Sequence, residues 1–313
     1  MALLLRLAWR NVWRNKRRSI ITILAVTFAA MFTIAMRGIQ IGTYEVNIRT
    51  AVGMFSSYLQ VQRTEYRENP SLQRSFPYNE ALTSLIKEQP AVTGYAPRIY
   101  ADGLVSFKEN SLGAGIVGVD PQIEKRVTDL HNKVSEGRFL QSDSTDEVVL
   151  GYKMLQNLNA AVGDRIVVLT QGYYGSLGNL LFQISGTVKT GSSELDAGAV
   201  FMGLTTAQRL LDMGNRVTAI AISLIDLDQV ASTKAQLNQR LPESNVTTLS
   251  WEELLPELKQ TIELDNISGL LFLAILVVVV AFGVLNSVLM SITQRFREFG
   301  ILLSVGMPQR KLV

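Results

Sequence analysis

The chain has no cysteine and only one histidine among its 313 residues. The absence of cysteine excludes disulfide bonds, thiolate metal ligands and a cysteine nucleophile from this polypeptide. The single histidine, His131, has no neighbour at a metal-ligand spacing, and no serine lies in a G-x-S-x-G sequence. No glycine is followed directly by lysine, so the phosphate-binding loop G-x-x-x-x-G-K-[ST] is also absent. These absences disfavour an enzyme and predict no catalytic residue, no metal and no cofactor in this chain.

One glycine-rich sequence, GAGIVG at residues 113–118, matches the dinucleotide-binding pattern G-x-G-x-x-G. That pattern needs a strand before it and a helix that opens from it, so that the helix N-terminus meets the pyrophosphate. Here the polar sequence KENS precedes the match and VDP follows it, with Pro121 better placed to begin a short helix. We therefore interpret these glycines as part of a tightly packed strand.

Two stretches lack charged residues for long enough to cross a membrane. Residues 19–36 carry no charge over 18 positions, and residues 266–294 carry none over 29. A helix rises about 1.5 Å per residue and the hydrocarbon core is roughly 30 Å thick, so we predict transmembrane helices at 19–42 and 266–293. A cleaved signal peptide is the alternative for the first stretch, but signal-peptide cores are usually only about 7–15 residues long. Asn286, late in the second stretch, is expected to face another helix.

Positive charge is concentrated beside the first span. Residues 1–18 hold six of the 30 Lys and Arg residues and no acid, so the remaining chain carries 24 bases against 27 acids. The overall basic balance is therefore no sign of nucleic-acid binding. Lys and Arg also follow the second span, whereas the residues before it are largely acidic. By the positive-inside rule both chain ends are cytoplasmic, and residues 43–265 lie outside.

The first 18 residues have an apolar face and an arginine stripe at helical spacing. Tryptophan and arginine beside a span are typical of an amphipathic helix in the lipid headgroup layer, and we predict a cytoplasmic helix of this kind at 1–18. The expected membrane-interface anchors are Arg6, Trp9, Arg10, Trp13 and Arg14. A simple basic topology anchor explains the same residues equally well.

Residues 43–265 alternate strand-like and helical runs, which predicts one α+β domain with two lobes. The predicted strands are 57–62, 103–107, 165–170, 180–188 and 217–223, and the predicted helices are 79–87, 151–159, 205–213, 227–240 and 251–264. Ser250 and Glu253 have the spacing of a capping box, and we expect the helix that follows to run without a break into the second span. The sequence thus predicts an α-helical membrane protein with a large extracytoplasmic α+β domain.

The segment QRFREFGILLSVGMPQRKL, residues 294–312, resembles the helix after the second span of FtsX/MacB-type ABC transporter permeases. The matching positions are Arg295, Arg297, Glu298, Phe299, Gly300, Ile301, Leu302 and Gly306. Ser304 stands where alanine is usual, and Leu303 where lysine is frequent. LAWRNVWRNKRRSIITILAV (7–26) is similar to the N-terminal helix and first span of the family. Within the domain, GIVGVDPQIEKRVTDL and EVVLGYKMLQNLNAAVGDRIVVL are similar to the lipoprotein-releasing (LolC/LolE-like) branch.

This resemblance implies a permease with four transmembrane helices, of which this chain holds two, and we expect the protein to continue beyond Val313. It implies that residues 294–313 form a coupling helix, with Arg295, Arg297, Glu298, Phe299, Gly300 and Gly306 at the contact with the ATPase. That partner is a separate cytoplasmic ABC ATPase, present in two copies, which binds ATP and Mg.

The remaining implied partners are a second permease copy or paralogue, membrane lipid, and a periplasmic carrier or lipoprotein cargo, with no nucleic acid. The implied location is the inner membrane of a bacterium, crossed more than once, with both ends cytoplasmic. The implied function is ATP-driven release of lipoproteins. Three alternatives stay open: a drug or peptide efflux permease of the same family, a two-span sensor with an external ligand-binding domain, and a regulator that activates external cell-wall hydrolases on the same permease scaffold.

Overall fold

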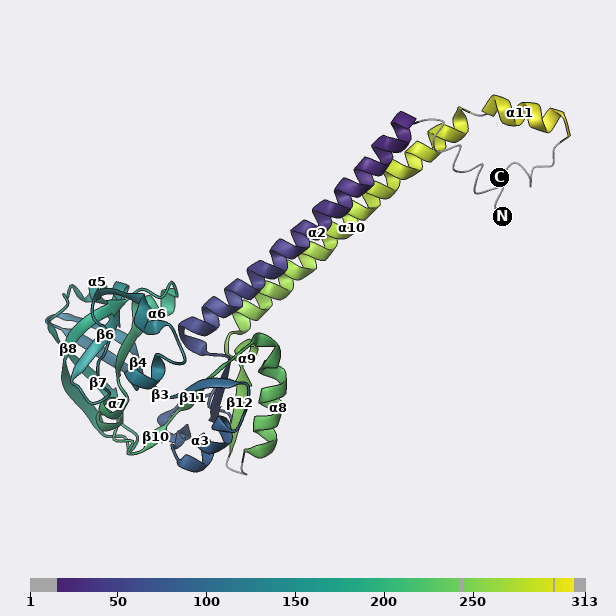
Figure 1. The fold of residues 1–313 in the computed structure, drawn as a ribbon. Coiled ribbons are helices and arrows are strands. Elements are labelled where there is room, and N and C mark those ends of the chain that lie inside the picture. Colours follow the sequence, from purple (N-terminus) through teal and green to yellow (C-terminus); the bar gives the residue numbers. More distant parts are fainter. Residues whose placement is uncertain (1–15, 242–244, 295, 307–313) are drawn as a thin grey trace. The chain divides into compact units, whose positions relative to one another are not determined.

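The computed structural model describes residues 16–241, 245–294 and 296–306 (Figure 1). The chain divides into two compact units. One is helical and comes from the two ends of the chain, within residues 1–46 and 259–313. The other is a domain, Asn47–Leu258.

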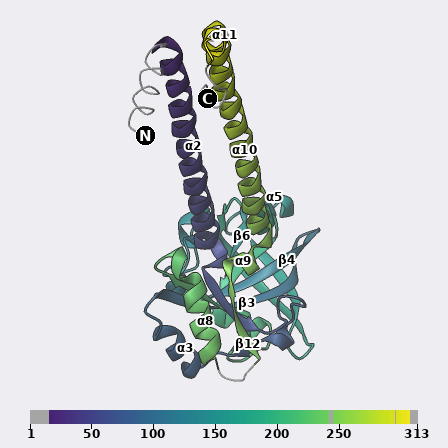
Figure 2. The ribbon, with the colours of Figure 1, turned by 90° about the vertical axis from the view of Figure 1, so that its right-hand side faces the viewer.

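Two long helices, α2 (Lys16–Ala51) and α10 (Pro256–Thr293), make up most of the helical unit, and the short helix α11 (Phe296–Ser304) follows them. α2 and α10 lie side by side (Figures 1 and 2). Both have the length and the apolar composition to cross a membrane, and none of the apolar stretch of either helix is buried. A core helix of a soluble protein would bury that surface, so lipid is the environment that suits this pair.

The chain enters α10 through a break that the sequence analysis did not predict. Helix α9 (Trp251–Leu254) begins with the predicted capping box, in which the Ser250 backbone N–H donates to Glu253 Oε2 at 2.8 Å. Leu255 then leaves the helical region, with φ −122° and ψ 64°, and α10 begins at Pro256. The predicted helix 251–264 is therefore interrupted at Leu255, because the proline ring disfavours helical backbone at the residue before it. From Pro256 the helix runs without a break into the second span, as predicted.

A ten-stranded sheet forms the centre of the domain, in the order β12-β1-β11-β3-β4-β9-β6-β8-β5, with β7 paired to β3 and β8. Most pairs are antiparallel, but β4 with β9 and β6 with β8 are parallel. The strands are β1 (Leu59–Arg63), β3 (Val92–Phe107), β4 (Asn110–Val119), β5 (Val134–Gly137), β6 (Glu147–Gly151), β7 (Arg165–Gln171), β8 (Leu177–Val188), β9 (Ala199–Gly203), β11 (Ala219–Leu224) and β12 (Val246–Ser250). A separate small pair joins β2 (Phe76–Pro77) to β10 (Arg216–Val217).

The long strand β3 belongs to two lobes. Its first half pairs with β11, and its second half pairs with β7. In the first lobe, α3 (Glu80–Lys87) and α8 (Val230–Arg240) pack beside β3 and β12 (Figures 1 and 2). In the second lobe, α5 (Tyr152–Leu158), α6 (Ser193–Gly198) and α7 (Leu204–Leu210) pack on β4, β6 and β9 around an apolar core that includes Phe139 and Phe201.

Several helix starts follow the local sequence closely. The predicted helices 79–87, 151–159 and 205–213 correspond to α3, α5 and α7. Asn79 caps α3, where its side chain accepts a hydrogen bond from the Leu82 backbone N–H at 3.0 Å. Pro121 begins the short helix α4 (Pro121–Glu124), as predicted, with Asp120 as its N-cap.

Candidate functional site

Helix α11 holds the described part of the predicted coupling segment. It begins at Phe296, which is 68% exposed, and ends at Ser304. Beyond it the Gly306 backbone N–H donates to the Leu303 carbonyl at 3.0 Å, and Gly306 has φ +90°. Glycine is the residue that adopts this left-handed conformation without strain, so Gly306 ends the helix.

The structure describes only some of the predicted contact residues. Arg297 and Gly300 lie on α11 and are exposed. Arg295 lies outside the described residues, and so do the side chains of Glu298 and Phe299. The predicted membrane-interface anchors also lie outside them: Arg6, Trp9, Arg10, Trp13 and Arg14. Described side chains of α11 thus offer one exposed cation beside exposed apolar groups.

Polar side chains join α2 to α10 at two levels. The Thr22 hydroxyl donates to Ser287 Oγ at 3.2 Å, and Arg37 Nη1 donates to Asn266 Oδ1 at 2.7 Å. The earlier residue of α2, Thr22, contacts the later residue of α10, Ser287, and the later residue Arg37 contacts the earlier residue Asn266. The two helices are therefore antiparallel. Asn286 was expected to face another helix, but it is exposed in this pair, and its neighbour Ser287 makes the contact. Successive helical residues point about 100° apart, which places only one of the two on the facing side.

Asp265 is the centre of a second group of contacts between the same helices. Its Oδ2 accepts from the Tyr44 hydroxyl at 2.5 Å and from Gln40 Nε2 at 3.1 Å. Gly269 allows Gln40 to approach, because a Cβ atom at that position would lie only 2.7 Å from Gln40 Nε2. These contacts fix the register of the helix pair at this end.

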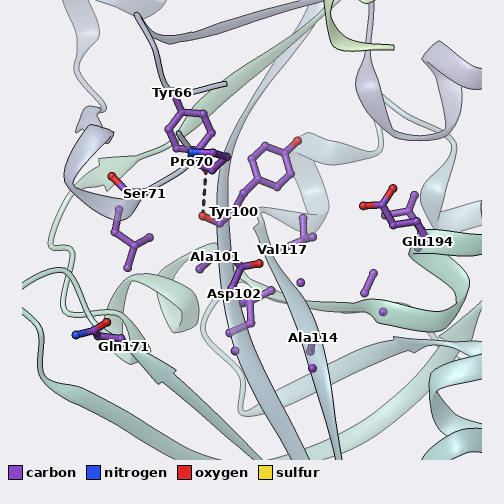
Figure 3. Close-up of a pocket in the computed structure, with 18 residues that line it drawn as sticks. Tyr66, Pro70, Ser71, Tyr100, Ala101, Asp102, Ala114, Val117, Gln171 and Glu194 are labelled. Carbon is purple, nitrogen blue, oxygen red and sulfur yellow. Dashed lines mark hydrogen bonds between the residues drawn. The ribbon is translucent and has the colours of Figure 1, made fainter. Parts of the chain in front are cut away.

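A cavity of about 610 Å³ lies in the domain over strands β3 and β4 (Figure 3). Asp102 on β3 stands opposite Gly115 on β4, and both line the cavity. A Cβ atom at Gly113 would meet no atom within 4 Å. The cavity is therefore open above this residue, because glycine has no side chain to fill it. At Gly118 a Cβ atom would lie 2.6 Å from the Cβ of Ala207. The interpretation of a tightly packed glycine strand therefore holds at Gly118 and fails at Gly113.

A second cavity of about 800 Å³ adjoins the first. Five residues line both cavities: Tyr66, Pro70, Tyr100, Glu194 and Leu195. The Tyr66 hydroxyl donates to the Tyr100 backbone carbonyl at 3.4 Å (Figure 3). Burial raises the pKa of Tyr66 to about 12, so this phenol is neutral at physiological pH.

A chain of side-chain contacts connects the core of the domain to these cavities. Arg98 on β3 is fully buried and pairs with the buried Glu124. Burial alone would lower the pKa of Arg98, but the adjacent carboxylate outweighs it and raises the pKa. Arg98 Nη1 also donates to the Tyr100 hydroxyl at 3.0 Å, and Gln60 Nε2 donates to the same oxygen at 3.3 Å. The cavity wall is thus held in place by a buried, charge-assisted network.

The sequence analysis predicted neither cavity. The signal that could have indicated one is the run of small residues at 113–115 on a strand, but the opposing wall comes from residues about 50 positions earlier and 80 later. Across the described ranges, no group of three or more His, Asp or Glu side chains could hold a metal ion. The arrangement offers hydrogen-bonding and apolar surface for binding.

Two apolar helices that flank a large α+β domain define a membrane protein with an extracytoplasmic domain. The family model of the MacB-like periplasmic core domain matches residues 19–240, and the chain belongs to this family of FtsX/MacB-type ABC permeases. The resemblance seen in the sequence is confirmed, including the relation to LolC.

Curated relatives are distant in sequence. The lipoprotein-releasing system transmembrane protein LolC of Neisseria meningitidis is 22% identical over 232 residues, which cover 72% of this chain and 56% of that protein. The pyoverdine export ATP-binding/permease protein PvdT of Pseudomonas syringae is 25% identical over 336 residues, covering 98% of this chain and 47% of that protein. The chain spans about half the length of these relatives. The crystal structure of the periplasmic region of MacB from Actinobacillus actinomycetemcomitans is 17% identical, with a TM-score of 0.47, and covers 71% of this chain and 98% of that one.

Proposed function

We propose that this chain is the membrane subunit of an ABC transporter and transmits ATP-driven motion from a separate ATPase to its extracytoplasmic domain. In this proposal α11 is the coupling helix, and two ATPase copies bind ATP and Mg at the cytoplasmic face. The chain works beside a second permease copy or paralogue and is itself non-catalytic. The observation that carries the proposal is a short helix with an exposed arginine and exposed apolar side chains, directly after a transmembrane helix, in a chain of this family.

The contacts between α2 and α10 support a mechanical role. Sliding one helix along the other would break the Thr22–Ser287 and Arg37–Asn266 hydrogen bonds. Inside the hydrocarbon core no water replaces a lost hydrogen bond, so such sliding is opposed. A force along the axis of one helix is therefore transmitted to the other.

The proposed topology places both chain ends in the cytoplasm and the domain on the outer side of a bacterial inner membrane. Because the chain has no cysteine, single cysteines report accessibility without background. We expect a membrane-impermeant maleimide to label Glu109→Cys on the domain in intact spheroplasts, and to label Ser304→Cys on α11 only after permeabilisation. Labelling of the second variant in intact spheroplasts would contradict the topology.

The coupling role is tested in the complex with its ATPase. We expect the double variant Arg297→Ala, Glu298→Ala to lose substrate-stimulated ATP hydrolysis while membrane insertion is unchanged, because charge-assisted contacts to the ATPase are removed. Lys108→Ala with Glu109→Ala removes an equally charged exposed pair from the domain and is the matched control. Stimulation that survives in the α11 variant argues against coupling, and failure of any ATPase to bind favours the two-span sensor instead.

For the cargo we propose lipoproteins, released from the membrane, with a periplasmic carrier as partner. The support is the similarity to LolC and the two stretches of the domain that resemble its branch. Depletion of the protein should then leave lipoproteins in the inner-membrane fraction.

Export of a small molecule or peptide is the second candidate. It is favoured by PvdT, whose match covers 98% of this chain rather than 72%. Unchanged lipoprotein fractionation together with intracellular retention of a secreted compound would select this candidate.

A further inference from the structure

We propose that a third cavity, in the first lobe of the domain, binds a small organic anion. The carboxylate of this ligand pairs with Arg63 and Arg216, and its apolar body fills the rest of the cavity. The cavity has a volume of about 370 Å³ and lies where the start of α3 meets β1, β2, β10 and β12 (Figure 1). The site depends neither on α11 nor on an ATPase, so its test is independent of the coupling role.

The less exposed arginines of the domain point to an anion at this place. Four arginines of the domain are not exposed: Arg63, Arg74, Arg98 and Arg216. Arg74 and Arg98 each pair with a carboxylate, at 3.6 and 2.5 Å. Arg63 and Arg216 have no carboxylate within 4.0 Å among the residues that the structure describes. A charge that is partly removed from water is costly unless an opposite charge accompanies it, so these two arginines indicate an anionic ligand.

Both arginines border the same cavity, although they come from different strand pairs. Arg63 ends β1 and stands opposite Val246 on β12. Arg216 on β10 stands opposite Pro77 on β2. Directly opposed residues of antiparallel strands extend their side chains to the same face, and all four of these residues line the cavity. The register of the two strand pairs therefore brings both arginines to one site.

The two guanidinium groups lie along one short segment and keep donors free. Arg216 Nε donates to Ser75 Oγ at 2.8 Å, and Arg216 Nη2 donates to the Ser75 carbonyl at 2.5 Å. Ser75 also lines the cavity. Arg63 Nη1 lies 3.5 Å from the Gln73 carbonyl, two residues earlier, which is a long contact. Within the described ranges, Arg216 Nη1 and Arg63 Nε and Nη2 have no hydrogen-bond acceptor, so they are available to a carboxylate.

The remaining lining suits an apolar body. Its apolar residues come from β2, α3 and β12: Phe76, Pro77, Ala81, Leu82 and Val246. No carboxylate is among the described residues that line the cavity, so the cavity attracts an anion and repels an ammonium group. Its volume falls in the range of about 300–1,000 Å³ that is usual for small-molecule sites. Because the planar guanidinium matches a planar carboxylate, a carboxylic acid with an apolar body fits this site.

The test compares three probes with the same hydrocarbon body on the full chain in phosphatidylcholine nanodiscs, with empty nanodiscs as the blank. The probes are the anion 3-phenylpropionate, the neutral amide 3-phenylpropionamide and the cation 3-phenylpropylammonium. We expect saturable binding of the anion in ligand-observed NMR titrations and no saturable binding of the cation. The amide should bind at least about ten-fold more weakly than the anion, because charge-assisted hydrogen bonds are lost. Equal affinity for amide and anion, or no saturable binding of the anion, would overturn the proposal.

Acetate tests the contribution of the apolar lining. It keeps the carboxylate but buries almost no apolar surface, so it should displace 3-phenylpropionate only at concentrations at least about ten-fold higher. Acetate that competes with equal affinity would mean that the arginines hold a simple inorganic or organic ion, and it would overturn an apolar ligand.

Two variants and a control locate the site. Arg63→Gln removes one of the two charges, and Ala81→Phe keeps both charges but adds bulk at an exposed lining position; each should weaken anion binding by at least about ten-fold. Arg165→Gln removes an equal charge from an exposed position on β7 outside the cavity and should bind as the wild type does. Wild-type affinity in Arg63→Gln or in Ala81→Phe would overturn the proposal. Binding that appears only in Glu243→Gln would identify a carboxylate of the chain itself as the occupant and would overturn it as well. The comparison of probes on the wild-type chain decides even if no variant folds.

Discussion

Arg98 and Glu124 form a bidentate ion pair inside the domain. Arg98 Nη2 lies 2.5 Å from Glu124 Oε1, and Nε lies 3.2 Å from Oε2, while the two side chains are 0% and 2% exposed. The planar guanidinium matches the carboxylate, and the Thr128 hydroxyl donates to the same Oε1 at 2.7 Å. Since Arg98 is on β3 and Glu124 ends α4, the pair fastens α4 to the sheet. Through Tyr100 it also positions the cavity wall.

The first prediction concerns this pair. Glu124→Leu should lower the free energy of unfolding by about 3–5 kcal/mol, because it leaves the buried Arg98 charge without the Glu124 carboxylate. Adding Arg98→Met should recover most of that loss, since it removes the uncompensated charge. Urea unfolding followed by circular dichroism measures both.

The control for this prediction is the exposed pair Arg240–Glu88. Glu88→Ala should change the unfolding free energy by only about 0–1 kcal/mol. If the double variant Arg98→Met, Glu124→Leu is no more stable than Glu124→Leu alone, the buried-charge explanation is wrong.

The second prediction contrasts two glycines on β4. Gly118→Val should destabilise the domain by about 1–3 kcal/mol, because its Cβ would meet the Cβ of Ala207 at 2.6 Å. Gly113→Val should leave stability unchanged or slightly higher, because its Cβ enters open space and valine favours a strand. Thermal unfolding of the two variants side by side decides, and equal midpoints would contradict the packing described for Gly118.

The third prediction is a loss of stability in alkali that depends on Tyr66. The unfolded tyrosine ionises near its ordinary pKa of 10, whereas burial raises the pKa of Tyr66 in the folded domain to about 12. Between these values the unfolded state releases a proton that the folded state retains, so the contribution is complete below pH 10 and is lost as the pH rises to 12. Tyr66→Phe should make the free energy of unfolding less sensitive to pH in this window. In a tyrosinate absorbance titration of the folded protein, the variant should lose the contribution of one tyrosine that ionises near pH 12.

Tyr174→Phe is the control for the alkaline prediction, because Tyr174 is 78% exposed. This variant should keep the full alkaline decline and the late component of the titration. A pH dependence that is the same in Tyr66→Phe and in the wild type would show that Tyr66 ionises normally.

The fourth prediction concerns the Thr22–Ser287 hydrogen bond between the membrane helices. A double-mutant cycle with Thr22→Val and Ser287→Ala, measured by unfolding in mixed micelles, should give a coupling of about 0.6 kcal/mol and at most about 1.7 kcal/mol. The same cycle with Asn286→Ala in place of Ser287→Ala should give no coupling, because Asn286 is exposed in the helix pair. Equal couplings at the two positions would mean that α10 is rotated from the orientation described.

The features that the sequence predicted are those set by neighbouring residues. Charge-free runs indicate the spans, and the starts of α3, α4 and α9 follow from Asn79, Pro121 and the Ser250–Glu253 spacing. Strands β6 and β9 were not predicted. They lie in the middle of the sheet with few exposed positions, so they lack the alternation of a half-buried strand, and distant strands decide their pairing.

The cavities were beyond sequence analysis for a related reason. Gln60 and Gln62 alternate with Leu59 and Val61 on β1, which is typical of a strand with one solvent-exposed face. All four residues are buried, because other parts of the domain cover the polar side of the strand. A polar side chain that is covered only in the folded chain looks like a surface residue until the fold is known.

Leu255 makes the two connections between the helices and the domain unequal. α2 continues without a break to Ala51 and into a π-helical turn, Val52–Ser56, whose Gly53 carbonyl accepts from the Asp129 backbone N–H at 2.8 Å. α10 instead starts after one non-helical residue, Leu255. Helical backbone is therefore continuous through one of the two connections and interrupted in the other.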